Sequence, residues 1–346
     1  MNGKRRKNQS RGKEREMKEK HRNKILSWGL LVCGIIVWNL WVPPCWGAED
    51  LDKFPSKPIT MIIHFAVGGS SDLTGRKLAD SGSKILGQPI VPENKVGGAG
   101  VIALNAVAKA NPDGYTVGTF SYSASVIAPH LRAVPYNVKQ DFTYIMQYAE
   151  YPQAFCVLAN ARWKTFKEFI EEARKNPNKL TYATAGAKSG QHILMEQVAL
   201  AEKVKITHVP THGGSEVVTQ QLGGHVDGSL AAELAPHVRS GNVRALAVAG
   251  EKRLDSMPDV PTFTELGYKL ESPLWLGFCA PKGLDPRIIK KLHDAFKKAY
   301  EDPSFKELCA TLVMTPIYRG PEAFKEMVIK DYDGQARILK QLGFMK

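Results

Sequence analysis

The sequence predicts an α/β fold in which helices cover a parallel β-sheet. Short β-rich apolar runs alternate with segments of helical periodicity along most of the chain. Glycine-bearing loops join several of these strands to the helices that follow them, as at 66–72. Of the 346 residues, 43% are hydrophobic and 23% are charged, and this ordinary balance excludes wholesale disorder. The length favours about two domains.

The alternation begins after Pro55 with the apolar run 59–65, in which β-branched residues predict a strand. Loop 66–72 interrupts the apolar pattern, and helical spacing then extends from 73 to 86 and ends at Gly87. The next expected elements are a strand at 89–91, a helix that opens at 97–100 and ends at 110, and a strand at 115–120.

The same alternation resumes in the middle of the chain. Helices are expected at 164–175, 193–203 and 215–222, and strands at 180–184, 205–209 and 243–248. Long helices are expected near the end, at 285–301 and 321–342.

Two extended apolar runs, 152–158 and 274–280, are interpreted as crossings between two domains, because turn residues flank each of them. If both connect the same pair of domains, residues 48–151 and 274–346 together form one discontinuous domain. Residues 152–273 then form the other domain.

Residues 1–47 have the three parts of a secretory signal peptide: a basic start, the apolar stretch 25–42, and small residues two positions apart at the end. They hold +8 of the net charge of +13, and the basic residues elsewhere are dispersed, which argues against nucleic-acid binding. An uncleaved membrane anchor and a lipid-attachment site at Cys45 are alternatives. Translation from Met17 would give a signal of normal length. In each case the bulk of the chain lies outside the cytoplasm.

Three cysteines, Cys156, Cys279 and Cys309, follow the predicted signal peptide. They allow at most one disulfide, and whether Cys156 and Cys279 pair is left open. Their spacing does not match a zinc site.

Three loops each follow a predicted strand and open a predicted helix: 66–72, 186–192 and 211–215. The free N–H groups and the dipole at a helix start attract anions. In an open α/β sheet the ligand lies at the carboxyl ends of the strands, so the loops are expected to converge on one cleft. Ser70 and Ser189 are expected to be N-caps. The alternative is that these residues only start helices.

Enzyme motifs are incomplete. Residues 98–103 fit the dinucleotide fingerprint, but no acidic residue follows at about 20 positions. Ser81 and Lys84 match a β-lactamase pair without its companion motif. His208 and His212 have metal-like spacing only on a helix, and Pro210 lies between them. We therefore expect no enzyme and no metal site, and keep a secreted hydrolase and a sensory receptor as alternatives.

A series of short motifs together is similar to the Bug family, the solute receptors of tripartite tricarboxylate transporters. The motifs, in order, are Pro55-Ser-Lys-Pro-Ile59, Gly68-Gly-Ser-Ser-Asp72, Leu86-Gly-Gln-Pro89, Gly97-Gly-Ala-Gly100, Pro112-Asp-Gly-Tyr-Thr116, Tyr182-Ala-Thr-Ala-Gly186, His208-Val-Pro210, Leu222-Gly-Gly-His-Val-Asp227 and Pro258-Asp-Val-Pro-Thr262. The resemblance runs from about residue 54 to the end of the chain.

The resemblance implies a periplasmic binding protein of the second type, with two lobes and a hinged ligand cleft. It implies a small organic carboxylate as ligand, transporter membrane subunits as partners, and neither catalysis nor a cofactor. We expect a periplasmic monomer. By position, the residues implied to line one lobe are Val67, Gly68, Gly69, Ser70, Asp72, Ser121 and Ser123. Those implied for the other lobe are Ala185, Gly186, Lys188, Ser189, His192, Thr211 and Glu233.

The sequence departs from the family pattern at several of these positions. Val67 stands where Pro or Ala is frequent, Lys188 where Gly is common, and Thr211-His212 where Tyr-Lys is usual. The Lys188 ammonium either pairs with a second ligand carboxylate or points to solvent. Glu233 lies where an acidic residue can recognise a ligand amine or exclude anions. The identity of the carboxylate therefore stays open.

Overall fold

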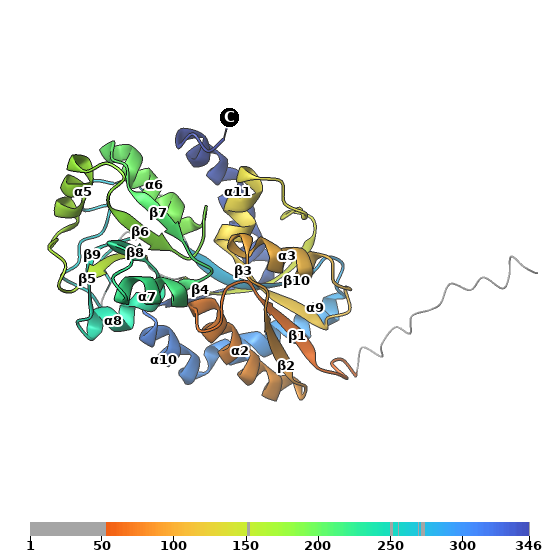
Figure 1. The fold of residues 1–346 in the computed structure, drawn as a ribbon. Coiled ribbons are helices and arrows are strands. Elements are labelled where there is room, and N and C mark those ends of the chain that lie inside the picture. Colours follow the sequence, from red (N-terminus) through yellow and green to blue (C-terminus); the bar gives the residue numbers. More distant parts are fainter. Residues whose placement is uncertain are drawn as a thin grey trace, which may run out of the picture. The chain divides into compact units, whose positions relative to one another are not determined.

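The computed structural model describes residues 53–150, 153–249, 252–254, 256–268, 270 and 274–345. The predicted signal peptide at 1–47 lies outside the described residues. Two β-sheets, each with helices on both faces, organise the described chain (Figure 1).

The first sheet has six strands in the order β11-β4-β10-β3-β1-β2. Its strands are β1 (Ile59–Ile63), β2 (Ile90–Asn94), β3 (Thr116–Ser121), β4 (Phe142–Glu150), β10 (Trp275–Pro281) and β11 (Thr315–Arg319). Strands β1, β2 and β3 are parallel, but β10 is antiparallel to β3 and β4, and β11 is antiparallel to β4. The prediction of a parallel sheet is therefore wrong for the half of this sheet that contains β10, β4 and β11. The reason is that β10 returns from the second sheet and runs in the direction opposite to β3.

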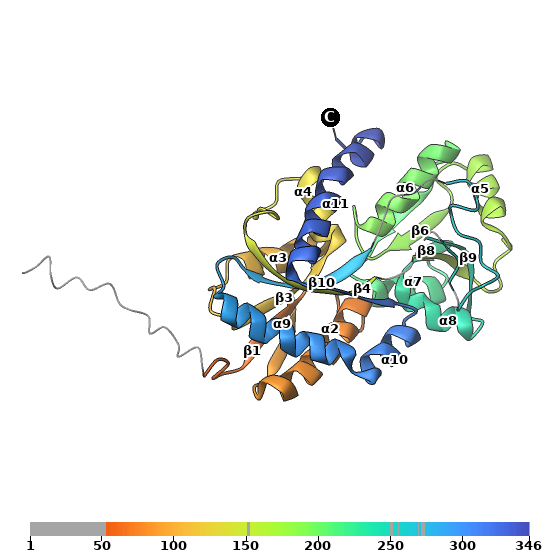
Figure 2. The same cartoon turned by 180° about the vertical axis from the view of Figure 1, so that it is seen from behind.

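Helices cover both faces of the first sheet. They are α2 (Ser70–Leu86), η1 (Gly98–Gly100), α3 (Val101–Ala108), η2 (Ser123–Ile127), α4 (Ala128–Leu131), α9 (Pro286–Glu301), α10 (Pro303–Thr311) and α11 (Pro321–Gln341). Figure 2 shows α2, α9 and α10 on one face and α3, α4 and α11 on the other. Gly277 lets α11 approach the sheet, since a β-carbon there would overlap the ring of Phe324.

The second sheet has five strands in the order β7-β6-β8-β5-β9. Its strands are β5 (Ala154–Leu158), β6 (Thr181–Thr184), β7 (Thr207–Pro210), β8 (Gly228–Leu230) and β9 (Val243–Val248). Strands β6, β7 and β8 are parallel, and β5 is antiparallel to both β8 and β9. Its helices are α5 (Phe166–Lys175), α6 (Gly190–Glu202), α7 (Gly214–Leu222), η3 (Ala232–Leu234) and α8 (Ala235–Arg239).

Strand β5 shows how the second sheet divides its core. Phe155 and Val157 belong to one hydrophobic cluster, and Cys156 belongs to another, because successive side chains of a strand point to opposite faces. The first cluster includes Phe169 of α5 and the second includes Val217 of α7. Both faces of this sheet are therefore buried.

The two runs interpreted as crossings are strands inside the sheets. The chain leaves the first sheet after β4, enters the second as β5, and returns to the first as β10. Because Cys156 lies in β5 and Cys279 in β10, these two cysteines belong to different sheets. Both are free thiols, as is Cys309, and all three are buried.

Within the described ranges, none of the helices combines the length and the apolar character needed to cross a membrane.

Candidate functional site

Three helices begin just beyond the carboxyl ends of strands β1, β6 and β7, as the loops at 66–72, 186–192 and 211–215 predicted. Ser189 is the N-cap of α6, and its Oγ accepts a hydrogen bond of 3.3 Å from the N–H of His192, so that prediction is confirmed. Ser70 is not an N-cap: Gly69 holds that position and Ser70 is the first helical residue of α2. The Ser70 hydroxyl is thereby free to donate elsewhere.

Each of the three helix starts keeps backbone N–H groups without an acceptor. In the described part of the chain no hydrogen bond is formed by the N–H of Ser71 in α2, Gln191 in α6, or Gly214 and Ser215 in α7. Such orphan donors, together with the positive end of the helix dipole, make a position where an anion is stabilised. The starts of α2 and α7 are adjacent, since a β-carbon at Gly69 would lie 3.8 Å from the Gly214 nitrogen.

Asp72 stabilises the first loop through buried hydrogen bonds and does not point into an open space. Its side chain is 98% buried, and its two oxygens accept from the N–H of Gly68 (2.9 Å), from Arg76 Nε (2.8 Å) and from Asn94 Nδ2 (2.9 Å). Gly68 has φ +80°, a conformation that favours glycine. Asp72 therefore positions Gly68 and Gly69. In contrast, Val67 at the tip of the loop is two-thirds exposed.

A buried histidine supports the first turn of α2 from the other side. His64 follows β1; its Nδ1 lies 2.5 Å from Thr119 Oγ1 and its Nε2 lies 3.2 Å from Ser71 Oγ. Burial lowers the pKa of His64 to about 3, so its ring is neutral at neutral pH. Sequence reasoning missed His64; the one available signal was a histidine directly after an apolar strand.

Two buried serines stand at the carboxyl end of β3. Ser123 Oγ accepts from the N–H of Gly190 (3.1 Å), which joins the first sheet to the start of α6. The Oγ of Ser121 is fully buried and has no hydrogen-bond partner among the described residues. A buried hydroxyl without a partner is unfavourable, and that of Ser121 stays available for a hydrogen bond at the carboxyl end of β3.

The loop between β6 and α6 has a constrained backbone. Gly186 has φ +152° and Lys188 has φ +59°, in the left-handed region that costs a non-glycine residue about 1–2 kcal/mol. The N–H of Lys188 donates to His192 Nδ1 (2.8 Å), and among the described residues no ion pair includes the Lys188 ammonium. Ala185 is buried beside them.

His192 lies within a polar cluster behind this loop. Because Nδ1 accepts from Lys188, its Nε2 carries the proton and faces Glu196 Oε1 at 3.4 Å. That hydrogen bond lowers the pKa of Glu196. His208, the neighbour of Val209 in β7, contacts Thr184 Oγ1 through Nε2 (2.7 Å). His192 thus fixes the loop that carries Lys188.

Thr211 and its neighbours bring the third loop against the first. Both the N–H and the Oγ of Thr211 donate to the carbonyl of Thr184, at 3.0 and 3.1 Å. Ser215 Oγ, in the first turn of α7, donates to the Val67 carbonyl (3.1 Å). Sequence reasoning singled out this loop but selected only Thr211 from it, although the pair Gly213-Gly214 marked the helix start.

Glu233 joins the two sheets at the same place. It lies in η3, after β8, and its Oε1 accepts from both the backbone N–H and the Oγ of Ser70, the latter at 2.6 Å. The carboxylate also rests against Gly214, where any β-carbon would overlap it. The predicted site residues from both sheets are therefore in one region.

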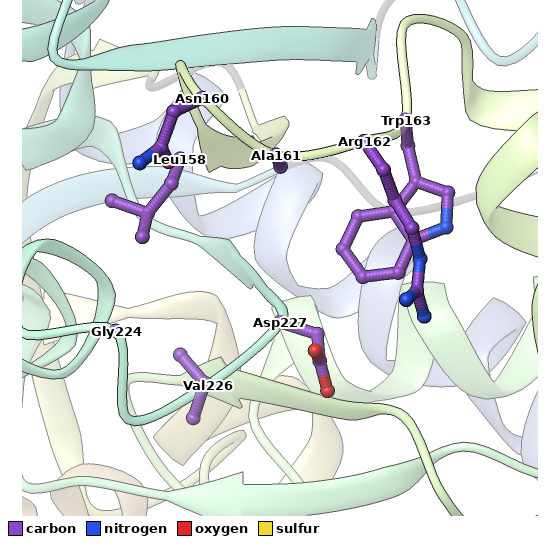
Figure 3. Close-up of a pocket in the computed structure, with 8 residues that line it drawn as sticks. All are labelled: Leu158, Asn160, Ala161, Arg162, Trp163, Gly224, Val226 and Asp227. Atoms are coloured by element: carbon purple, nitrogen blue, oxygen red, sulfur yellow. The ribbon is translucent and has the colours of Figure 1, made fainter.

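A hollow elsewhere is unrelated to this region. It has a volume of about 370 Å³ and is lined by Leu158, Asn160, Ala161, Arg162, Trp163, Gly224, Val226 and Asp227 (Figure 3). Asp227 lies beside Thr181, at the end of β6 opposite to Thr184. Its carboxylate accepts a hydrogen bond from the Thr181 N–H (2.8 Å). None of the predicted site residues lines it. Within the described ranges no group of three potential metal ligands occurs either.

Comparison with known proteins gives a consistent result. Residues 74–344 match the family described as "Tripartite tricarboxylate transporter family receptor". A protein of Cupriavidus necator, named for its position in the gbd 5' region, is 39% identical over 302 residues, which cover 85% of this chain and 90% of that protein.

Solved structures agree with the sequence matches. The periplasmic binding protein BugD is 31% identical with a TM-score of 0.80, over 85% of this chain and 100% of that one. MatC of Rhodopseudomonas palustris with bound malate is 27% identical, with a TM-score of 0.78 over 83% and 100% of the two chains. An R. palustris protein with adipate is 25% identical, with a TM-score of 0.79 over 84% and 98%.

Proposed function

Because the chain belongs to the tripartite tricarboxylate transporter receptor family, which consists of periplasmic solute-binding proteins rather than enzymes, we propose that it captures a small organic carboxylate for uptake. The partner is the membrane part of a tripartite tricarboxylate-type transporter. The protein acts in the periplasm as a monomer. In this proposal one lobe consists of residues 48–151 and 274–346, and the other of residues 152–273.

The observation that carries the proposal is the set of free backbone N–H groups at the starts of α2, α6 and α7. Charge-assisted hydrogen bonds contribute about 1.5–3 kcal/mol each. Three of them supply about 4.5–9 kcal/mol before the cost of ordering the ligand and the loops is subtracted, so other contacts must add to them if the complex is to reach the roughly −8 kcal/mol of a micromolar affinity. Ser121 supplies a hydroxyl to the same carboxylate or to its neighbour.

The ligand class follows from Lys188. Its ammonium has no ion pair among the described residues, yet its backbone is held in a costly conformation by His192. We propose that this ammonium binds a second carboxylate, so that the preferred ligand is a dicarboxylate. The relatives with malate and with adipate both hold dicarboxylic acids.

The test is a thermal-shift screen of the purified protein with malate, adipate and citrate against the matched amides and neutral sugars. A ligand at 100 times its Kd stabilises the folded state by about 2.7 kcal/mol and raises Tm accordingly. We expect shifts with the carboxylates alone. A shift produced only by uncharged sugars would contradict the proposal.

A further inference from the structure

We infer that Glu233 is an internal competitor for the ligand carboxylate, an autoinhibitory contact that occupies the anion-binding donors of α2 and joins the two sheets. The inference rests on the proposed function, because Ser70 lies at the same helix start of α2 whose next N–H, that of Ser71, is proposed to hold the ligand. The inference adds that a carboxylate of the protein itself, that of Glu233, takes the place of the ligand carboxylate at the start of α2.

The first step is the position of the carboxylate at α2. Glu233 Oε1 accepts from two donors of one residue, the N–H and the Oγ of Ser70. Ser70 is the first residue of a 17-residue helix, where the dipole favours a negative charge. The two partners are 163 residues apart in sequence and belong to different sheets, so this contact depends on the approach of the two sheets.

The second step is the environment of the other oxygen. Glu233 Oε2 faces Gly214 at the start of α7, and a β-carbon at Gly214 would overlap the carboxylate. The other helix start is also close, since a β-carbon at Gly69 would lie 3.5 Å from Oε1. The carboxylate is thus enclosed by the starts of two helices, in a space that two glycines leave open.

The third step concerns its charge. In the part of the chain that the structure describes, no lysine, arginine or histidine forms an ion pair with Glu233. Its charge is balanced by helix starts and by one hydroxyl. Helix starts and hydroxyls are also the groups expected to balance the charge of a bound organic carboxylate. The ligand carboxylate and the Glu233 carboxylate therefore compete for the same position.

The consequence is an exchange. A ligand carboxylate reaches the Ser70 donors only after Glu233 leaves them, because two carboxylates in contact repel each other. Part of the ligand's binding free energy is used for that displacement. In the ligand-free protein the same contact holds the loops of the two sheets together.

The experiment compares Glu233→Gln with Glu216→Gln. The second variant removes the same charge from the first turn of α7, where Glu216 Oε2 accepts from the nearby His212 N–H (2.9 Å). Calorimetric titration uses malate and adipate, with protein freed of endogenous ligand by extensive dialysis. We expect Glu233→Gln to lower Kd at least tenfold, whereas Glu216→Gln changes it less than threefold.

A second measurement does not depend on the ligand. Amide hydrogen exchange of the ligand-free protein should be at least threefold faster at 68–74 in Glu233→Gln than in the wild type, with no such change in Glu216→Gln. Unchanged exchange overturns the inference even if no ligand is found, and so does an equal or weaker affinity in Glu233→Gln. Failure of all carboxylates to bind either protein refutes the proposed function instead.

Discussion

The imidazole rings of His192 and His208 lie face to face, with their centroids 3.8 Å apart and their planes 11° from parallel. His192 comes from the first turn of α6 and His208 from β7, so the stack ties the loop that carries Lys188 to the second sheet. Burial lowers the pKa of His208 to about 3, and the adjacent imidazole of His192 contributes to the lowering.

This stack predicts the titration of His208. Its ring should stay neutral between pH 8 and pH 5, which NMR of the imidazole Cε1–H resonance would show. In His192→Gln the pKa of His208 should rise, because one of the two lowering causes is removed, but burial should keep it below 6.5. A midpoint near 6.5 in the wild type would contradict the buried position of the ring.

His64 predicts a loss of stability in acid. Its pKa is about 3 in the folded protein and about 6.5 when unfolded, so below pH 6.5 the unfolded state binds a proton that the folded state does not. The stabilising contribution is therefore present above pH 6.5 and is lost as the pH falls toward 3, by about 1.4 kcal/mol per pH unit. Urea unfolding at pH 7.5, 6 and 5 should give a flatter profile for His64→Asn than for the wild type. Parallel profiles would rule this contribution out.

Asp72→Asn should destabilise the protein and weaken ligand binding. It removes the charge that Arg76, Asn94 and the Gly68 N–H share, and hydrogen bonds to a buried charged group contribute about 1.5–3 kcal/mol. The matched control is Asp80→Asn on the same helix, whose i,i+4 pair with Lys84 is exposed and should cost less than about 0.5 kcal/mol. Equal losses in urea unfolding would show that Asp72 has no special role.

Ser121→Ala separates binding from stability. The unpartnered hydroxyl contributes nothing to the ligand-free protein, so the free energy of unfolding should stay the same or rise slightly. Kd for the ligand should rise about tenfold, the equivalent of one hydrogen bond. Ser125→Ala is the control: its Oγ donates to the Ser121 carbonyl (2.7 Å), so it should lose about 0.5–1.5 kcal/mol of stability without a change in Kd. If Ser121→Ala lowered the stability and left Kd unchanged, Ser121 would not belong to the ligand site.

Lys188→Gly should relieve backbone strain and impair dicarboxylate binding. Relief of the left-handed conformation, less the entropy of a glycine, leaves a gain of about 0–1.5 kcal/mol. Lys203→Gly is matched, because Lys203 has φ +54° at the C-cap of α6 and lies at the far end of that helix. Both variants should show the same change in Tm. Only Lys188→Gly should bind malate about tenfold more weakly, with monocarboxylates unaffected; equal affinities for malate would place the ammonium in solvent.

Most elements could be predicted because their signals are local. The helix at 73–86 ends at Gly87 as expected, since apolar spacing and a terminal glycine lie within a few residues of each other. Strand β4 was missed, although it is an interior strand of the first sheet, between β11 and β10. Gln147 interrupts its apolar run, but in the structure Gln147 is fully buried and accepts from Arg319, which is 172 residues away. No local pattern contains that partner.

Sequence alone therefore determined the kind of fold, the family and the three loops that start helices, because periodicity, glycine positions and ordered motifs are properties of neighbouring residues. Only the tertiary structure decided the direction of β10, the stacking of His192 on His208 and the occupation of the Ser70 donors by Glu233. Each of these depends on where distant segments meet, and that is set by the burial of whole sheet faces rather than by any short run of residues.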